Sequence, residues 1–358
     1  MQNPFTTTFS KVPDYTYIPT EQQREIIENY SYETPSESVY KITGVRGSGK
    51  TVLLAKIEEE FIQENWKDKG WLVYRINPTR DMLKQLASFL YKEKWIKDSP
   101  KSKSVNISGS VLGTGGGVGF SKEENDAFFD IGVELNEMLN KATKLGKKIL
   151  IGIDEVSKTD EMVVFASEFG EWLRAGYAVY LVCTGLYENI EQLSNVKNLT
   201  FFRRATTVKT EPLNAIKMSE MYKNKLGIEL AEAKEMAAIT KGYPYAFQEL
   251  GVLYFKNREN LDKEELIESL KSELYAYSYE KIWEEMSEGD RILAYLLRGK
   301  NEYKRDDIMK KMKNSSNYSV YRDRLLKRGI ITARHSYISL ALPFFGNYLM
   351  EYCESPID

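Results

Sequence analysis

The sequence contains very little cysteine and histidine. Of its 358 residues only two are cysteines, Cys183 and Cys353, and only one is a histidine, His335. Two cysteines cannot build a disulfide framework or a cysteine-rich metal centre, so we expect a reducing, cytoplasmic setting. A single histidine argues against a histidine-based catalytic triad and against a histidine-rich metal site. We expect His335 to be a turn residue.

Long apolar runs and an excess of one charge are also missing. Nowhere do 18 apolar residues follow one another, and the first nine residues lack the basic start and apolar stretch of a signal peptide. Lys and Arg number 50 and Asp and Glu 52, so contact with nucleic acid would need a local basic patch. With 42% hydrophobic and 12% aromatic residues, the chain is predicted to be a soluble, folded protein of two or three domains without a membrane partner.

A complete phosphate-loop motif, G-x-x-x-x-G-K-[ST], lies between a predicted strand at 38–43 and a predicted helix. It comprises Gly44, Val45, Arg46, Gly47, Ser48, Gly49, Lys50 and Thr51, and Val52 follows in the helix. Glycines let the backbone wrap closely around phosphates, and free N–H groups at the helix start face them. Lys50 is predicted to reach the β and γ phosphates of a nucleoside triphosphate, and Thr51 to hold Mg²⁺. The alternative is a glycine turn with a solvated lysine.

Acidic and hydroxyl side chains end two later apolar runs. Residues 148–153 form a buried-strand pattern that ends in Asp154 and Glu155, and residues 178–185 form another that contains Thr184. Asp154 is predicted to hold the water shell of Mg²⁺, and Glu155 to orient and deprotonate the attacking water. Thr184 is expected to touch the γ phosphate or that water, or else to cap the next helix. With a strand at 70–78 and helices at 80–96 and 128–144, the pattern predicts an α/β fold with a parallel sheet.

Two segments leave alternatives open. The leader contains Val12 and Pro13, with Tyr17 and Ile18, and these are predicted either to pack on the adenine or to be core-packing residues. Residues 99–122 contain an alternating run interrupted by glycines, which favours an inserted β-hairpin over a glycine-rich linker.

The C-terminal part is predicted to be helical at first and then mixed. Helical spacing covers 216–226, 230–240, 246–255 and 263–286, and later 291–297, 305–312 and 318–328, before two short strands at 330–333 and 337–342. Three helices followed by a hairpin indicate a winged helix. Over residues 299–335, eleven basic against four acidic residues give a net charge of +7. The predicted DNA contacts are Asn317, Tyr318, Tyr321, Arg322, Arg324 and Arg334, although winged helices also contact proteins.

Together these motifs, in this order, resemble the AAA+ ATPases over about residues 1–350. Within that superfamily the chain is most similar to the group that joins archaeal and bacterial origin-recognition ATPases to the STAND ATPases. The resemblance rests on Asn3-Pro4-Phe5 and Thr8-Phe9-Ser10, the phosphate loop and Gly242-Tyr243-Pro244. It implies an AAA+ nucleotide-binding domain at 1–210, a helical lid at 211–286 and a winged helix at 287–358.

The resemblance also implies roles for single residues. Thr184 matches the sensor 1 position, and Asn77 matches the polar residue that restrains the catalytic glutamate. Arg203 or Arg204 matches the arginine finger that acts on a neighbouring subunit, unless the two form an exposed structural pair. No sensor 2 arginine is present, and Pro244 stands near the adenine as in STAND lids. Tyr17-Ile18-Pro19-Thr20 stands where a charged Gly-Arg element often follows the leader.

These features predict an oligomeric, Mg²⁺-dependent ATPase whose nucleotide state controls engagement of duplex DNA or a DNA-bound partner. The alternative is a STAND-like signalling switch, for example in phage defence or in a toxin pair, whose winged helix contacts protein.

Overall fold

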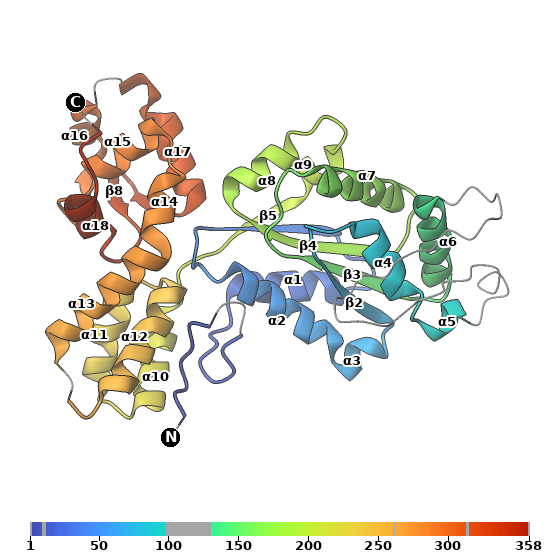
Figure 1. Cartoon of the computed structure of the whole chain (residues 1–358), viewed down its shortest axis with the longest axis horizontal. Helices are drawn as coiled ribbons and strands as arrows, with labels where there is room; N and C mark the ends of the chain where they lie inside the picture. Colours follow the sequence, from blue (N-terminus) through green and yellow to red (C-terminus); the bar gives the residue numbers. More distant parts are fainter. Residues whose placement is uncertain (1, 9–11, 98–129, 261, 313–314, 357–358) are drawn as a thin grey trace, which may run out of the picture.

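The computed structural model describes residues 2–8, 12–97, 130–260, 262–312 and 315–356 (Figure 1). The predicted hairpin at 99–122, with Phe9 and Ser10 of the leader, lies outside these residues. The described part shows three regions in Figure 1: a sheet with helices on both sides, a group of helices, and a C-terminal unit in orange and red. None of the helices it contains is long and apolar enough to cross a membrane.

A five-stranded parallel sheet, in the order β2-β3-β4-β1-β5, forms the centre of the first region. Every neighbouring pair is parallel, so the carboxyl ends of all five strands lie along one edge. The strands are β1 (Val39–Thr43), β2 (Trp71–Ile76), β3 (Lys148–Ile153), β4 (Val179–Gly185) and β5 (Thr206–Lys209). The predicted α/β class with a parallel sheet is therefore confirmed.

Both faces of this sheet are covered, and alternate side chains along a strand point into two separate apolar cores. On β3, Ile149, Ile151 and Ile153 belong to one apolar core, whereas Leu150 belongs to the core of the other face. A strand that is buried on both faces of the sheet needs apolar residues at every position. The sequence at 148–153 shows this continuous apolar pattern. One face is covered by α1 (Glu21–Ser31), α2 (Lys50–Ile62) and α3 (Glu64–Lys67). The other is covered by α4 (Met82–Leu90), α5 (Lys94–Lys97), α6 (Ile131–Lys144), α7 (Asp160–Arg174), α8 (Tyr187–Ser194) and α9 (Thr200–Arg204).

The second region is the predicted group of helices after residue 212. It contains α10 (Ala215–Leu226), α11 (Leu230–Thr240), α12 (Pro244–Asn257) and α13 (Lys263–Leu274). The continuous helix predicted at 263–286 is wrong in detail, because a π-helical turn, η2 (Tyr275–Tyr279), separates α13 from α14 (Glu280–Glu284). In this turn the ring of Tyr279 packs against Phe345, and the Tyr279 hydroxyl donates to the Pro343 carbonyl. Tertiary packing therefore explains the change of helical pitch.

The C-terminal unit, residues 287–358, contains α15 (Glu288–Leu296), α16 (Arg305–Lys311), η3 (Ser315–Asn317) and α17 (Tyr318–Arg328). Its antiparallel sheet has the order β6-β8-β7, formed by β6 (Tyr303–Lys304), β7 (Ile331–Arg334) and β8 (Tyr337–Leu340). The three helices and the hairpin occur at the predicted places, whereas β6 and the last helix, α18 (Phe345–Tyr352), were not predicted. The assignment as a winged helix stays a prediction.

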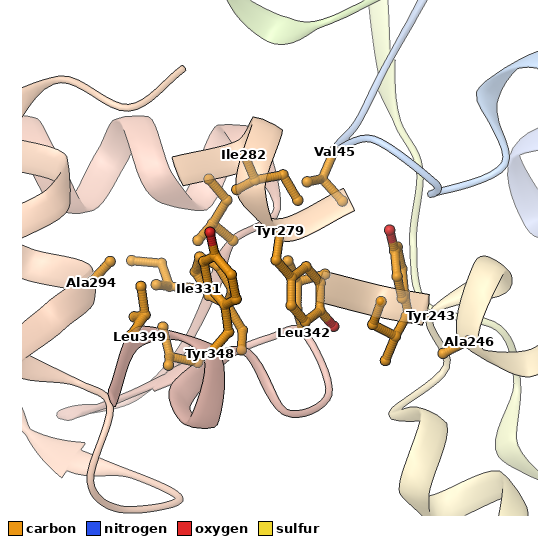
Figure 2. Close-up of a cluster of buried hydrophobic side chains, with 14 of the residues drawn as sticks. Val45, Tyr243, Ala246, Tyr279, Ile282, Ala294, Ile331, Leu342, Tyr348 and Leu349 are labelled. Carbon is orange, nitrogen blue, oxygen red and sulfur yellow. The ribbon is translucent and has the colours of Figure 1, made fainter. Parts of the chain in front are cut away.

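The helical region and the C-terminal unit share one apolar core. A single cluster of buried side chains runs from Tyr243 and Ala246 in the helical region to Ile331 and Leu349 in the C-terminal unit (Figure 2). Val45 of the phosphate loop belongs to the same cluster. The phosphate loop therefore packs directly against the part of the molecule that carries the C-terminal unit.

Candidate active site

The phosphate loop connects the carboxyl end of β1 to the start of α2. Gly47 and Gly49 have φ values of 74° and 84°, in the left-handed region that favours glycine. A Cβ on Gly47 would lie 2.2 Å from the Tyr243 hydroxyl oxygen, so this position also lacks space for a side chain. Because the loop ends at the N-terminus of α2, free backbone N–H groups and the positive end of the helix dipole point to the same place.

Lys50 is the first residue of α2, and its ammonium group lies inside the loop. Its Nζ donates to the carbonyl oxygens of Gly44 and Val45, each at 3.0 Å. Burial lowers the pKa of Lys50 from its usual value to about 8, although the nearby carboxylates of Asp154 and Glu155 oppose this effect. The loop thus holds a cation where phosphate oxygens are predicted to lie.

Asp154 follows β3 directly and accepts two hydroxyl groups on the same carboxylate oxygen. Thr51 Oγ1 lies 3.2 Å from Asp154 Oδ1, and the Thr184 hydroxyl donates to that oxygen as well. Hydroxyl and carboxylate oxygens side by side are the donor set that Mg²⁺ prefers. Thr51 and Asp154 therefore fit the predicted Mg²⁺ site.

Thr184 has a different position from the one predicted. Its side chain is fully buried, and its hydroxyl also accepts the Glu155 backbone N–H at 3.1 Å. Thr184 therefore fixes Asp154 and the backbone of Glu155 from the buried side and does not line the cavity. Glu155 has a φ of 56°, which is uncommon for a residue with a side chain, and it is exposed on the cavity wall. The strained backbone directs its carboxylate toward the cavity.

A cavity of about 430 Å³ opens above the phosphate loop. It is bounded by the leader, the loop, the carboxyl ends of β3 and β4, and the start of α12. Of the predicted nucleotide residues, Pro13, Tyr17, Ile18, Pro244, Glu155 and the loop from Arg46 to Val52 line it, whereas Val12, Gly44, Val45 and Asp154 do not. The volume and the combination of apolar and charged walls suit a nucleotide.

Several cavity residues were missed by the sequence reasoning. They are Thr6, Thr7, Thr8, Thr16, Asn189, Tyr245, Gln248 and Tyr277. Gln248 stands four residues after Pro244 on α12, so helical spacing alone could have placed it on the same face. Its Oε1 accepts the Thr6 backbone N–H at 3.2 Å and the Thr16 hydroxyl at 3.0 Å, which fixes the leader on α12. Tyr245 and Tyr277 stack with ring centroids 4.0 Å apart.

Two solved structures share this fold. The Walker-type ATPase PABY2304 of Pyrococcus abyssi superposes with a TM-score of 0.61 at 15% identity, over 95% of this chain and 98% of that one. The ORC2 protein of Aeropyrum pernix, in its ADPNP and ADP complexes, gives a TM-score of 0.57 at 12% identity, over 96% of each chain. The chain has the fold of the AAA+ P-loop ATPases. No family model and no curated protein matches the sequence.

Three residues predicted to act at this site lie outside the cavity. Asn77 follows β2 and is exposed, and its side chain accepts the backbone N–H and hydroxyl of Thr79 at 2.9 and 2.7 Å. It therefore caps a turn and does not restrain Glu155 in this arrangement. Arg203 and Arg204 are exposed at the end of α9, and Arg203 Nε donates to the Ser194 carbonyl at 3.1 Å. Neither lines the cavity of its own chain.

Arg204 instead lines a second cavity, of about 340 Å³, together with Ser38 and Val39. Val39 begins β1, whereas the phosphate loop follows the end of that strand, and the four residue steps between span about 13 Å. Both arginines are thus near the opposite edge of the sheet from the phosphate loop.

The predicted DNA residues divide into two groups in the structure. Tyr318 is 1% exposed, and Tyr321 packs so closely on α15 that a Cβ on Gly289 would lie 2.1 Å from its ring. Arg324 Nε lies 2.7 Å from Asp290 Oδ2, and the Asp290 side chain is 1% exposed. The prediction that Tyr318 contacts DNA is corrected because its side chain is buried, and Tyr321 and Arg324 are corrected because they hold α17 on α15.

The other group remains available at the surface. Arg334 is exposed at the end of β7, and Arg322 is half-buried on α17. Asn317 donates to the Tyr321 hydroxyl at 3.4 Å and is only partly accessible. Lys304 and Arg305 are exposed beside them, next to β8. Among the described residues, no ion pair involves Lys304, Arg322 or Arg334.

Proposed function

We propose that this chain is an ATPase that binds ATP with Mg²⁺ and hydrolyses it, and that works as an oligomer whose nucleotide state controls engagement of duplex DNA. The observation that carries the proposal is that Lys50, Thr51 and Glu155 line one cavity at the carboxyl edge of the sheet, with Asp154 hydrogen-bonded to Thr51. Such an edge is where ligands bind in open α/β sheets.

The residues of the cavity would divide the work as follows. The loop N–H groups and Lys50 bind the phosphates, and the apolar walls at Pro13, Ile18 and Pro244 receive the base. Thr51 and Asp154 would hold Mg²⁺, which, when bound, neutralises charge on the phosphate oxygens. Glu155 accepts a proton from the attacking water, whose oxygen bonds to the γ phosphorus while the bond to the β-γ bridging oxygen breaks.

Support for DNA as the partner comes from charge. The net charge of +7 over residues 299–335 contrasts with −2 for the whole chain. Lys304, Arg322 and Arg334 present part of this charge at the surface without a carboxylate partner among the described residues. Phosphate contacts by such side chains supply most of the affinity in non-specific DNA binding.

A second function, a signalling switch of the STAND kind, is favoured by a different observation. Part of the C-terminal unit contacts the ATPase region, because Arg328 at the end of α17 pairs with Glu188 on α8 at 2.9 Å. In such a switch the C-terminal unit would contact protein, and the nucleotide would turn over rarely.

The proposed hydrolysis is tested with two variants of the phosphate site. Lys50→Ala is expected to abolish nucleotide binding, whereas Glu155→Gln should bind ATP but turn it over about 10²- to 10⁴-fold more slowly. Binding is measured by equilibrium titration and turnover by phosphate release with Mg²⁺. Equal turnover in the wild type and Glu155→Gln would remove Glu155 from the reaction. Sizing with and without nucleotide and duplex DNA tests the oligomer and separates the two candidate functions.

A further inference from the structure

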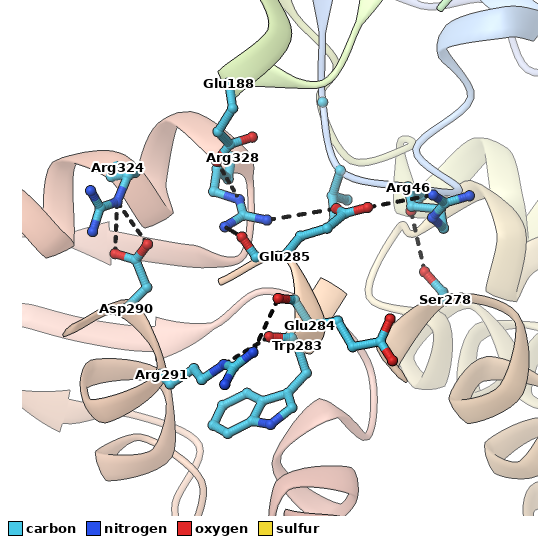
Figure 3. A network of polar contacts seen from close by, with 12 residues as sticks. Arg46, Glu188, Ser278, Trp283, Glu284, Glu285, Asp290, Arg291, Arg324 and Arg328 are labelled. Carbon is cyan, nitrogen blue, oxygen red and sulfur yellow. Dashed lines mark hydrogen bonds and ion pairs between the residues drawn. The ribbon is translucent and has the colours of Figure 1, made fainter. Parts of the chain in front are cut away.

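Arg46 is held at both ends by the part of the molecule that follows the nucleotide-binding region. Its carbonyl oxygen accepts the Tyr243 hydroxyl at 2.6 Å and the Ser278 hydroxyl at 3.5 Å. Its guanidinium Nη2 lies 3.5 Å from Glu285 Oε1 (Figure 3). Arg46 also lines the cavity, and no acceptor contacts its buried Nε among the described residues. One phosphate-loop side chain thus faces both the nucleotide cavity and a carboxylate at the end of α14.

Glu285 is shared between two arginines. Its Oε2 lies 3.9 Å from Arg328 Nη2, and its carbonyl accepts Arg328 Nη1 at 3.3 Å. Arg328, whose side chain is 6% exposed, places its Nε 2.9 Å from Glu188 Oε1 on α8. The four side chains form a line of alternating charge from the phosphate loop to the interface between α17 and α8 (Figure 3).

Among the described residues, few other polar contacts hold α17 to the ATPase region. Lys209, at the end of β5, donates its ammonium group to the Leu326 carbonyl, and Lys327 Nζ lies 5.6 Å from the ring centre of Tyr187. Both lysines are exposed, whereas the Arg328 side chain is 6% exposed. Arg328 and its two carboxylates are therefore the part of this interface where a change of charge has the largest effect.

We propose that Arg46 communicates phosphate binding to the C-terminal unit by exchanging Glu285 for the triphosphate. The inference rests on the proposed nucleotide binding and specifies how that site is regulated. A triphosphate carries several negative charges and competes with one carboxylate for the same guanidinium. Glu285 is a third exposed, so its release costs little. Once released, its full charge acts on Arg328, which moves toward Glu285 and loosens its pair with Glu188.

Thermodynamic linkage makes this testable from the nucleotide side. If the triphosphate must displace Glu285, then nucleotide binding and the Arg46 pair oppose each other, and removing the pair strengthens binding. Glu285→Gln keeps the shape and removes the charge. It should bind ATP about two- to five-fold more tightly than the wild type at low salt. The expected sign of the change is therefore a gain in affinity.

Two controls isolate the effect. Glu284 lies next to Glu285 but pairs with Lys281, at 2.7 Å, so Glu284→Gln should leave the affinity unchanged. In an Arg46→Gln background, Glu285→Gln should no longer tighten ATP binding, because the guanidinium for which Glu285 and the triphosphate compete is absent. An equal gain in both backgrounds would mean that Glu285 acts by general repulsion and would overturn the exchange.

The second readout is the distance between α8 and the C-terminal unit. Fluorophores are placed at the exposed positions Asn195 and Ser336, each replaced by cysteine, in a Cys353→Ser background. ATP should lengthen the distance in the wild type, and in Glu285→Gln the ATP-dependent change should shrink at least two-fold. Unchanged affinity in Glu285→Gln, or an ATP response equal to that of the wild type, overturns the proposal while leaving nucleotide binding intact. A wild type that binds no ATP removes the proposed function and this inference together.

Discussion

At the residue scale, Lys50 and the two acids opposite it have different environments. Lys50 is surrounded by the loop, and burial lowers its pKa to about 8. Asp154 is held by two hydroxyl groups, whereas Glu155 is exposed on the cavity wall. A fixed carboxylate suits metal binding and an exposed one suits proton transfer from water. Asp154 and Glu155 are adjacent in the sequence, so their different predicted roles follow from their different surroundings in the structure.

The lowered pKa of Lys50 predicts that ATP affinity depends on pH. The ammonium form binds phosphate, and in the free protein this form is lost as the pH rises through about 8. Bound phosphates favour the charged form, so binding takes up a proton above that pH, and affinity should fall up to about tenfold per pH unit there. Equilibrium titration between about pH 7 and pH 9.5 measures the effect.

Lys50→Arg provides the matched comparison for this pH dependence. A guanidinium stays charged throughout this range, so any residual affinity of Lys50→Arg should be nearly independent of pH. A wild-type affinity that stays constant up to pH 9.5 would contradict the assignment of Lys50 as the titrating phosphate ligand.

At the scale of single elements, α17 shows how a basic helix can combine structural and surface roles. Arg324 and Arg322 are two residues apart, yet Arg324 pairs with a buried aspartate while Arg322 is partly exposed without an ion pair among the described residues. Residues two apart on a helix do not share a face, so their charges have different tasks.

This difference predicts unequal effects on stability. Arg324→Ala leaves the Asp290 carboxylate buried without its partner and should lower the free energy of unfolding of the C-terminal unit by about 2 to 4 kcal/mol. Arg322→Ala should change it by less than about 0.5 kcal/mol. Denaturant titration of the full chain measures both. If Arg322→Ala is as destabilising as Arg324→Ala, the division of roles within α17 is wrong.

The sequence was a good guide to elements whose pattern is set locally. The phosphate loop, the strand before Asp154 and the three helices of the C-terminal unit carry their own periodicity and turn residues, and all appear where predicted. The break at Tyr275–Tyr279 did not follow from periodicity, because its cause is packing on Phe345, some 70 residues away. The structural roles of Tyr321 and Arg324 on α17 could not be predicted either. Nothing in the local sequence indicates that Gly289 and Asp290 of α15 lie against this helix.

The same limit applies to the candidate site. Lys50, Thr51, Asp154 and Glu155 could be predicted because each follows a strand in a parallel sheet, and strand ends meet at one edge. Thr184 was predicted to face the phosphate but is buried beneath the acids, because it lies within β4 and not after it. The leader residues Thr6 to Thr8 reach the cavity because Phe5 packs on Phe247 and Tyr222 and Gln248 accepts the Thr6 backbone N–H.

At the scale of the whole molecule, the position of Arg203 and Arg204 bears on oligomerisation. They lie near the edge of the sheet opposite the phosphate loop, where they cannot serve the site of their own chain. If either acts on a neighbour, specific ATPase activity should rise with protein concentration. Replacing both by alanine should lower turnover about 10³-fold or more, since an arginine finger stabilises transition-state charge.

Mixing variants tests whether the arginines act between subunits. Lys50→Ala keeps Arg203 and Arg204 but lacks the lysine that binds phosphate. The Arg203→Ala, Arg204→Ala double variant keeps Lys50 but lacks both arginines. A mixture of the two should regain part of the activity, because one subunit of each kind completes a site. If sizing demonstrates mixed oligomers and they remain inactive, the action of Arg203 or Arg204 on a neighbour is contradicted.

The central claim is that nucleotide at the phosphate loop controls DNA engagement by the C-terminal unit, and one salt titration tests it directly. Duplex affinity is measured for Glu155→Gln with ATP and without nucleotide, from about 50 mM salt upward. We predict tighter binding with ATP, and a slope of log K against log salt that flattens by about two to three units when Lys304, Arg322 and Arg334 are replaced by glutamine. Equal affinity in both nucleotide states, or no duplex binding in either, would contradict the account.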